Sequence, residues 1–443
     1  MFKIDEIQYV DVNKNETIIV NLINGLADVI NKEVENSLKK NDFETISEND
    51  LRNLKNRNYL FENEKEYKEF IKNIFDTASY YEKREIPNFL YIPSYNCNLC
   101  CSYCYQRGYT IDENGLAKNN VNEFFKYLKN KVSELEKNNK NKYFNRDIVI
   151  TLMGGEPLLI ENRNIIKEFV DICVEDGYSF EIITNGITIK DYIDIINVPN
   201  LKGVQLTLDG AKAVHDKRRM ARNGEGTFDH IMEAIEVLLG LDIDVHLRIN
   251  VDNENIECLP CLAYSLNDFY SSNHFYPYIF LLEHEGCMEY KNVLEDYVAL
   301  EKIYKMQKSE PLLNNIDIAY IGKEIVDGIF SEDEFYPTTR KCSSSKNQYI
   351  YDSYGNVYKC WWGVGNSTFK INKKDEKRND DLWKNRQISK IKECISCKYR
   401  FLCGGGCIGR MIKDERVDIQ KGECHDFEKI LDVSIKENYN ERL

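Results

Sequence analysis

The chain has 443 residues, of which 42% are hydrophobic, so it can bury the cores of two or three domains. Its formal net charge of −14 argues against a nucleic-acid partner that is held by its phosphates. No apolar run approaches the roughly 18 residues of a membrane-spanning helix, and the first residues lack the pattern of a signal peptide. We therefore expect a cytoplasmic protein with no nucleic-acid and no membrane partner.

The 15 cysteines are the most informative part of the composition. In a reducing compartment disulfides are rare, so thiolates that bind metal are the usual alternative. Ten of the 15 fall into two groups of regular spacing, one near residue 100 and one between residues 342 and 424. We expect both groups to bind metal.

The first part of the chain has the pattern of a small separate domain. Short β-rich runs are expected at residues 7–12, 17–22 and 26–30, with turns at Asn13-Lys14-Asn15 and Asn24-Gly25. Helices are expected at residues 33–39, 47–55 and 64–81, the last two behind possible N-caps at Ser47 and Asn63.

From residue 88 onward strands alternate with helices. Strands are expected at residues 89–92, 148–152, 180–184, 203–208, 244–250 and 278–282. Helices are expected between them at residues 121–135, 165–176, 189–196, 228–239 and 257–269. Six parallel strands with crossover helices predict a partial (β/α)6 barrel of the α/β class, with functional groups at the carboxyl ends of the strands.

The first cysteine group directly follows the first of these strands. Cys97, Cys101 and Cys104 are separated by three and then two residues, whereas Cys97, Cys100 and Cys104 form an alternative set with the reverse spacing. We prefer the first set, in which the aromatic Tyr103 precedes the last cysteine. Three thiolates are one short of the four that close a four-iron cluster, so one iron would be open to a small ligand. A zinc knuckle is the alternative.

Polar and glycine-rich motifs follow the next strands. They are Gly154, Gly155, Glu156 and Pro157 after the second strand, Thr184 and Asn185 after the third, Thr207 and Asp209 after the fourth, and Arg248 and Asn250 on the fifth. Glycines let a backbone approach a ligand closely, carbonyl and carboxylate oxygens accept hydrogen bonds from an ammonium group, and arginine suits a carboxylate. For Arg218, Arg219 and Arg222 a solvated surface is the alternative, and His215 is expected to be structural.

The second group has seven cysteines. They are Cys342, Cys360, Cys394, Cys397, Cys403, Cys407 and Cys424. Residues 349–358, between the first two, are a β-hairpin candidate, and residues 404–406 are three glycines that can wrap closely around a cluster. A zinc tetrathiolate site made by four of the seven is the alternative.

Together, the Cys97–Cys104 loop, the Gly-Gly-Glu-Pro motif and the seven-cysteine series resemble radical S-adenosylmethionine (radical SAM) enzymes that carry a SPASM extension. The resemblance covers about residues 85–427. It implies that Cys97, Cys101 and Cys104 hold a 4Fe-4S cluster whose open iron is chelated by S-adenosylmethionine. The residues it implies for contact with S-adenosylmethionine are Tyr103, Gly154, Gly155, Glu156, Pro157, Thr184, Asn185, Thr207, Asp209, Arg248 and Asn250.

The same resemblance implies two auxiliary 4Fe-4S clusters. One would be held by Cys394, Cys397, Cys403 and Cys424, and the other by Cys342, Cys360 and Cys407. For the missing fourth ligand of the second cluster, either Cys287, Cys258 or Cys261 folds in, or one iron is open to a substrate thiolate.

The N-terminal region resembles the winged-helix element with which maturases of ribosomally made peptides capture a leader peptide. We therefore expect five parts: a leader-recognition domain (1–84), the radical SAM partial barrel (85–285), a helical linker (286–340), the SPASM domain (341–427) and a C-terminal helix (428–443). Within the linker, helices are expected at residues 293–306 and 318–330. The resemblance implies oxidative modification of a precursor peptide, most plausibly to Cys thioether crosslinks, with electrons from a flavodoxin or ferredoxin. The alternatives are an anaerobic sulfatase-maturing enzyme and a non-catalytic metal scaffold; against the former, Trp361 stands where those enzymes carry an acidic base.

Overall fold

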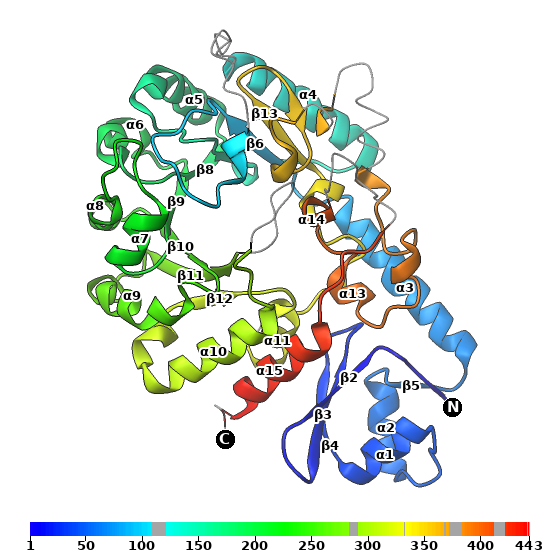
Figure 1. Cartoon of the computed structure of the whole chain (residues 1–443). Helices are drawn as coiled ribbons and strands as arrows, with labels where there is room; N and C mark the ends of the chain where they lie inside the picture. Colours follow the sequence, from blue (N-terminus) through cyan, green and yellow to red (C-terminus); the bar gives the residue numbers. More distant parts are fainter. Residues whose placement is uncertain are drawn as a thin grey trace.

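The computed structural model describes residues 1–108, 121–282, 291–331, 333–366, 369–371, 383–411, 421–440 and 442. These residues form a nine-stranded sheet, a three-stranded sheet and a two-stranded sheet (Figure 1). Cys287, one of the expected candidates for a metal ligand, lies outside the described residues.

The nine-stranded sheet is the centre of the fold. Its spatial order is β12 (Asp317–Ala319), β11 (Phe275–Leu281), β10 (Val245–Val251), β9 (Leu201–Leu208), β8 (Ser179–Ile183), β7 (Val149–Leu152), β6 (Asn88–Ile92), β13 (Gln348–Asp352) and β14 (Val357–Tyr358). Neighbouring strands run parallel except for the β13–β14 hairpin. The six predicted parallel strands and the predicted hairpin are confirmed, and so is the α/β class.

Helices cover the outer face of the curved sheet (Figure 1). They are α4 (Val121–Asn139), α5 (Arg163–Asp176), α6 (Ile193–Ile196), α7 (Lys212–Arg218), α8 (Phe228–Leu239) and α9 (Leu259–Ser265). One large apolar core between helices and sheet includes Phe124, Phe169, Ile182 and Leu206, each with a fully buried side chain. The polar motifs follow at the carboxyl ends of the strands.

Two parts of the sheet differ from expectation. A helix was predicted from residue 318 to residue 330, but residues 317–319 form β12, which pairs with β11, and the helix α11 covers only Lys323–Phe330. The turn between them contains Gly322 at φ +89°. In addition, β13 extends the barrel sheet, because Gln348–Asp352 pair in parallel with Asn88–Ile92. The cysteine-rich part of the chain therefore begins on the same sheet as the barrel.

The N-terminal region has the predicted order of three strands followed by helices. Its strands β2 (Ile7–Asp11), β3 (Glu16–Asn21) and β4 (Ala27–Asn31) form an antiparallel sheet, which precedes α1 (Lys32–Lys40), α2 (Glu48–Asn56) and α3 (Glu64–Glu82). A small ribbon of β1 (Phe2–Lys3) and β5 (Leu60–Phe61) completes it. The predicted N-caps Ser47 and Asn63 accept hydrogen bonds from the third residue of their helices, as capping requires.

This N-terminal region packs against the cysteine-rich end of the chain. The guanidinium of Arg400, in α13 (Arg400–Cys403), lies 2.6 Å from the carboxylate of Glu6, which also accepts a hydrogen bond from Tyr67. The C-terminal helix α15 (Phe427–Asn440), expected from the sequence, packs on β2. The two ends of the chain are thus joined into one structure (Figure 1).

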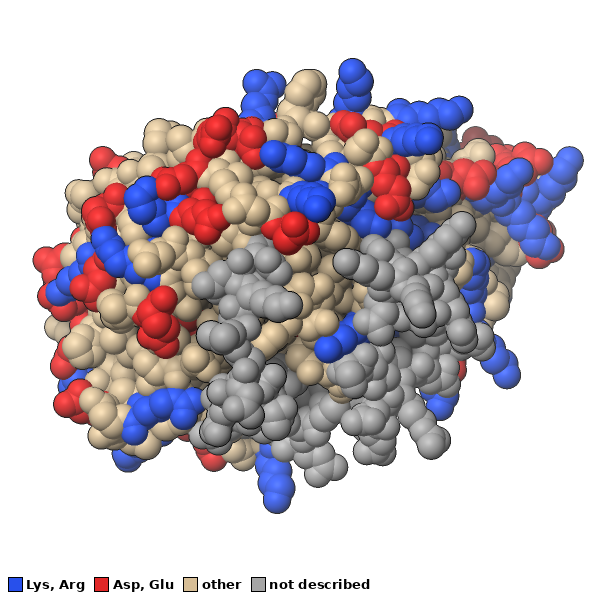
Figure 2. All heavy atoms as spheres, turned by 90° about the horizontal axis from the view of Figure 1, so that it is seen from above, with Lys and Arg blue, Asp and Glu red and all other residues tan. Residues whose placement is uncertain are grey.

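On the face that Figure 2 shows, basic and acidic side chains are interspersed. Among the described residues of this face there is thus no large field of one sign to steer a charged partner. Within the described part of the chain, no helix is long and apolar enough to cross a membrane.

Candidate active site and cysteine-rich centres

The first cysteine loop runs from the end of β6 toward the segment at residues 218–222. The amides of Cys100 and Ser102 donate to the carbonyls of Met220 and Arg218, at 3.0 and 3.3 Å. In the opposite direction, the amide of Arg222 donates to Asn98 at 2.9 Å. These bonds hold the loop against the carboxyl ends of β9 and β10.

The loop separates Cys100 from the other three cysteines. Burial raises the pKa of Cys97 to about 12, and the neighbouring thiols of Cys101 and Cys104 add to this shift. The Cys100 thiol instead points to the carbonyl of Met220, at 3.4 Å. Cys97, Cys101 and Cys104 therefore lie together, and Cys100 faces the neighbouring loop.

The Gly-Gly-Glu-Pro motif packs directly on this loop. A Cβ atom at Gly155 would stand 2.3 Å from the carbonyl oxygens of both Tyr95 and Asn96, so only glycine fits. The amides of Gly155 and Glu156 donate to the carbonyls of Ser94 and Asn96, at 3.1 and 2.7 Å. The two glycines thus let the cysteine loop approach the motif closely, and their expected contact with a ligand stays a prediction.

The buried carboxylate of Glu156 organises the ends of β7 and β8. It accepts hydrogen bonds from the Thr184 hydroxyl at 2.6 Å and from the backbone amides of Asn185 and Leu158 at 2.7 and 2.9 Å. Burial raises its pKa, and these three donors oppose the shift. The side chain of Asn185 extends the network to the cysteine loop by donating to Asn98 at 2.7 Å.

A second buried network connects Tyr103 to the ends of β9 and β10. Its hydroxyl donates to Asp209 at 2.8 Å and accepts from Arg219 and Asn250, at 2.8 and 3.0 Å. Arg218 in turn donates to Asp209 at 3.0 Å. Unsatisfied buried polar groups are costly, so this network fixes the geometry of the loop.

Arg218 and Arg219 are the functional candidates that sequence reasoning undervalued. Both are buried rather than on a solvated surface. Arg218 bridges Asp209 and Asp252, and two carboxylates compensate its buried charge. Burial opposes the charge of Arg219, but the neighbouring Tyr103, Cys101 and Asp209 raise its pKa on balance. No local signal in the sequence separates such arginines from surface arginines, because their partners lie on other strands.

The remaining predicted residues lie around these networks. Thr207 and Arg248 are register partners on β9 and β10. The Arg248 guanidinium lies 3.7 Å from the ring centre of Phe280 and donates to Asn250 at 2.8 Å. His215 is fully buried and hydrogen-bonded, as expected of a structural residue.

The seven cysteines of the second group separate into two sets. Burial raises the pKa of Cys360, and the thiols of Cys342 and Cys407 raise it further. Burial likewise raises the pKa of Cys394 to about 11, with contributions from Cys397 and Cys424.

Cys403 joins the second of these sets. Burial raises its pKa to about 12, and its cysteine neighbours are Cys394 and Cys397. The structure thus brings together Cys342, Cys360 and Cys407 in one set, and Cys394, Cys397, Cys403 and Cys424 in another.

Cys258, which we considered as a fourth ligand, is placed elsewhere. A Cβ atom at Gly210 would lie 2.5 Å from the Cys258 sulfur, so this cysteine packs against the end of β9. Cys261 is exposed on α9. Among the described residues, no three His, Cys, Asp or Glu side chains are close enough to hold a single metal ion. Such an ion needs sulfurs within about 4 Å of each other, whereas a four-iron cluster separates them further.

Aromatic and carboxylate contacts join the first cysteine loop to the second group. The rings of Tyr105, next to Cys104, and Trp362 lie edge to face with 4.6 Å between their centres. The hydroxyl of Tyr95 donates to Asp352, the last residue of β13, at 2.8 Å. These contacts join the two cysteine regions.

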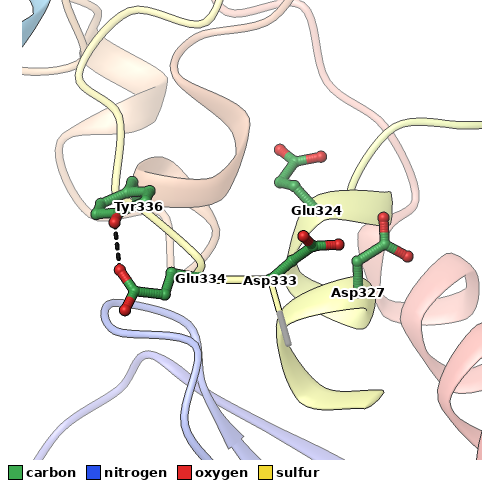
Figure 3. Close-up of a pocket in the computed structure, with 5 residues that line it drawn as sticks. All are labelled: Glu324, Asp327, Asp333, Glu334 and Tyr336. Atoms are coloured by element: carbon green, nitrogen blue, oxygen red, sulfur yellow. Dashed lines mark hydrogen bonds between the residues drawn. The ribbon is translucent and has the colours of Figure 1, made fainter. Parts of the chain in front are cut away.

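A separate pocket of about 470 Å³ lies beside α11 (Figure 3). Its lining residues are Glu324, Asp327, Asp333, Glu334 and Tyr336. Glu334 accepts a hydrogen bond from Tyr336, and Asp327 pairs with Lys323 at 2.6 Å. None of these residues was predicted as part of a site, and their contacts are those of a charged surface.

A partial barrel with three cysteines directly after its first strand defines the class of iron–sulfur enzymes to which radical SAM proteins belong. Residues 91–260 match the model of the radical SAM superfamily. Residues 91–260 are therefore a radical SAM domain, and the protein is an enzyme. A domain of this kind implies S-adenosylmethionine and a 4Fe-4S cluster as cofactors.

Known proteins resemble more than this segment. A Cysteine-type anaerobic sulfatase-maturating enzyme of Clostridium novyi (strain NT) is 26% identical over 350 residues, which are 71% of this chain and 85% of that protein. Native anSMEcpe with bound AdoMet and Cp18Cys peptide matches at a TM-score of 0.56 and 18% identity, over 80% of this chain and 98% of that one.

A second solved structure matches nearly the whole chain. Streptococcus suis SuiB bound to precursor peptide SuiA has a TM-score of 0.53 and 15% identity, over 96% of this chain and 99% of that one. At these identities the two structures establish the fold.

Proposed function

We propose that this radical SAM enzyme is a maturase that oxidatively modifies a ribosomally made precursor peptide, most plausibly by forming Cys thioether crosslinks. The observation that supports this proposal is the N-terminal region, whose three-stranded sheet and helices have the expected order and pack on the cysteine-rich end. The SuiB match leaves only 4% of 443 residues, or about 18 residues, uncovered, so it includes most of residues 1–84.

The proposed leader site is the outer edge of β4. This strand pairs only with β3 among the described strands. At the two ends of the β3–β4 pair, the amide of Asn21 donates to the carbonyl of Leu26 and the amide of Lys32 donates to the carbonyl of Asn15. These two bonds show which residues of β4 turn their backbone groups toward β3 and which turn them away. By this alternation the amide and carbonyl of Val29 point away from β3, and the Val29 residue is 49% exposed. An extended peptide can add to such an edge as a further strand.

We assign Cys97, Cys101 and Cys104 to the 4Fe-4S cluster that binds S-adenosylmethionine. They fit this role because the three thiols are neighbours, and because two buried networks fix the loop that carries them. When bound and reduced, the cluster supplies the electron that cleaves S-adenosylmethionine to methionine and a hydrogen-abstracting 5′-deoxyadenosyl radical. The chain positions the cofactor with Tyr103 and Asn250 and keeps water from the site by burial.

We assign the two sets of the second group to two auxiliary 4Fe-4S clusters. Each thioether link replaces one C–H and one S–H bond by a C–S bond. One hydrogen leaves as an atom to the 5′-deoxyadenosyl radical, the other leaves as a proton, and one electron remains. In this proposal the auxiliary clusters would accept this electron, and a flavodoxin- or ferredoxin-type protein would return electrons to the first cluster.

Formylglycine formation on a sulfatase is the second candidate, because the curated relatives carry that name. Against it stands Trp361, at the position where the sulfatase-maturing enzymes are expected to place an acidic base. Its indole N–H donates to Gln348 at 3.2 Å, so this side chain is a packed hydrogen-bond donor and not a base.

Binding of the precursor peptide to the anaerobically purified protein tests the proposal. The probe is the fluorescently labelled peptide encoded beside the gene. Val29→Pro removes the outward amide and should weaken binding at least tenfold, whereas Val29→Ala keeps the amide and should bind within about threefold of wild type. If Val29→Pro bound the peptide with wild-type affinity, the proposed strand addition at β4 would be refuted.

A further inference from the structure

A buried arginine lies between the two sets of the second cysteine group. Arg386 is only 2% exposed. One of its terminal nitrogens donates to the carbonyl of Lys421 at 2.8 Å, and the other donates to the carbonyl of Gly405. Both of these acceptors are backbone carbonyl oxygens, so these two bonds position the guanidinium without adding a second charge beside it.

The two acceptor segments run along the cysteine sulfurs. Gly405 lies between Cys403 of one set and Cys407 of the other. Gly422, next to Lys421, passes so close to the second set that a Cβ atom there would be 3.3 Å from the sulfur of Cys394. The hydrogen bonds of Arg386 therefore place its charge between both sets.

The backbone conformation of the three glycines brings the Gly405 carbonyl to Arg386. Gly404, Gly405 and Gly406 all have positive φ, at 58°, 91° and 74°. A Cβ atom at Gly406 would stand 2.2 Å from the carbonyl oxygen of Glu423, and one at Gly405 would stand 2.8 Å from Ile391. Side chains other than hydrogen are excluded there, and the loop carries the Gly405 carbonyl toward Arg386.

The electrostatics agree with this placement. Burial lowers the pKa of Arg386, and four thiol groups oppose the shift. Two of them, Cys342 and Cys407, belong to one set, and two, Cys394 and Cys403, belong to the other. A cation buried among two groups of thiolates compensates charge for both of them.

We propose that Arg386 is the shared counter-cation of the two auxiliary cluster sites and raises the reduction potential of both clusters. This inference rests on the proposed function, which assigns a cluster to each set. Reduction adds a negative charge to a cluster, and a nearby fixed positive charge stabilises the reduced form. Arg386 thereby makes both centres better acceptors for the electron that remains when a crosslink forms.

Redox titrations of the anaerobically reconstituted full chain, followed by electron paramagnetic resonance, test the inference. Arg386→Gln keeps an amide donor and removes the charge. At a fixed potential it should lower the ratio of reduced to oxidised auxiliary clusters at least about tenfold, which is about 59 mV for a one-electron couple. Arg386→Lys restores the charge and should return both potentials toward the wild-type values.

Two internal references make the result specific. The S-adenosylmethionine cluster should shift less than the auxiliary clusters, because its assigned ligands lie on the loop after β6 and not on the segments to which Arg386 is hydrogen-bonded. Lys390 is an exposed cation in the same segment, and Lys390→Gln should change no potential, since solvent screens its charge.

Each outcome decides a separate claim. Unchanged potentials in Arg386→Gln, or a shift of one auxiliary cluster only, overturn the shared role. If Arg386→Gln loses auxiliary iron, then recovery of iron in Arg386→Lys supports the role of the charge, and loss in both variants overturns it. Wild-type protein with iron and sulfide for fewer than three clusters refutes the assignment of the auxiliary sites instead.

Discussion

His215 gives the sharpest quantitative prediction about the site. Its Nδ1 accepts a hydrogen bond from the amide of Asp209 at 3.2 Å. Thr227 donates its hydroxyl proton to the carbonyl of Arg219, so its oxygen accepts from His215 Nε2–H at 3.0 Å. The neutral imidazole is thus fully satisfied, and a proton on Nδ1 would face the Asp209 amide. Burial, with the neighbouring Arg219, Lys212 and Arg218, lowers the pKa of His215 to about 2.

The sign of the pH effect follows from this difference. The unfolded chain takes up a proton on His215 below pH of about 6.5, whereas the folded chain does not until about pH 2. The contribution of the neutral His215 to the free energy of unfolding is therefore fully present above pH 6.5, and it is lost progressively as the pH is lowered. At pH 5 the loss is about 1.5 pH units at 1.36 kcal/mol each, or about 2 kcal/mol. Glu35 and Glu423, whose pKa values are lowered to about 2, lose their contributions below the ordinary glutamate range.

Nitrogen-15 histidine spectra and urea unfolding measure this effect. The chain has six histidines, so His215→Gln assigns the signal. We expect the His215 signal to stay that of the neutral Nε2–H form down to pH 5. From pH 7 to pH 5 the free energy of unfolding should fall about 2 kcal/mol more in wild type than in His215→Gln. A signal that titrates near pH 6.5, or equal pH slopes, would refute the reasoning.

Four further variants probe the cysteine loop. Cys100→Ala should keep cleavage of S-adenosylmethionine while Cys101→Ala abolishes it, measured as 5′-deoxyadenosine by chromatography, and the reverse result would mean that the other triplet binds the cluster. Gly155→Ala should reduce cleavage at least 100-fold and keep auxiliary iron, because the added methyl meets two backbone carbonyls of the loop; near-normal cleavage would contradict this packing. Tyr103→Phe removes the hydroxyl that three polar groups share and should destabilise the protein by about 2–4 kcal/mol in urea unfolding, and a loss under 0.5 kcal/mol would mean that the network is dispensable.

The sequence predicted the six barrel strands because each is a short β-rich run whose apolar residues the core buries. It did not predict that β13 would pair with β6, since Gln348 and Asn88 are far apart in the chain and no local pattern encodes their register. The helix expected from residue 318 was wrong at its start for the same reason: Ile318 is apolar enough for a helix, and only its pairing with Ile279 makes it a strand.

The site was predictable where chemistry restricts residue type and spacing. The cysteines and the Gly-Gly-Glu-Pro motif are of this kind. The burial of Arg218, Arg219 and Arg386 was not predictable, because a charged residue in a sequence gives no sign of a partner contributed by another element. The packing of Gly155 on the cysteine loop was not predictable, since the backbone that approaches it comes from a distant part of the chain.

The most direct test of the central claim is the mass of the precursor peptide after anaerobic incubation with the reconstituted enzyme, S-adenosylmethionine and a reductant. We predict a loss of two hydrogens for each link, with one 5′-deoxyadenosine formed per link, and thiols that no longer react with alkylating reagents. A peptide of unchanged mass beside full cleavage of S-adenosylmethionine would contradict the proposed crosslinking.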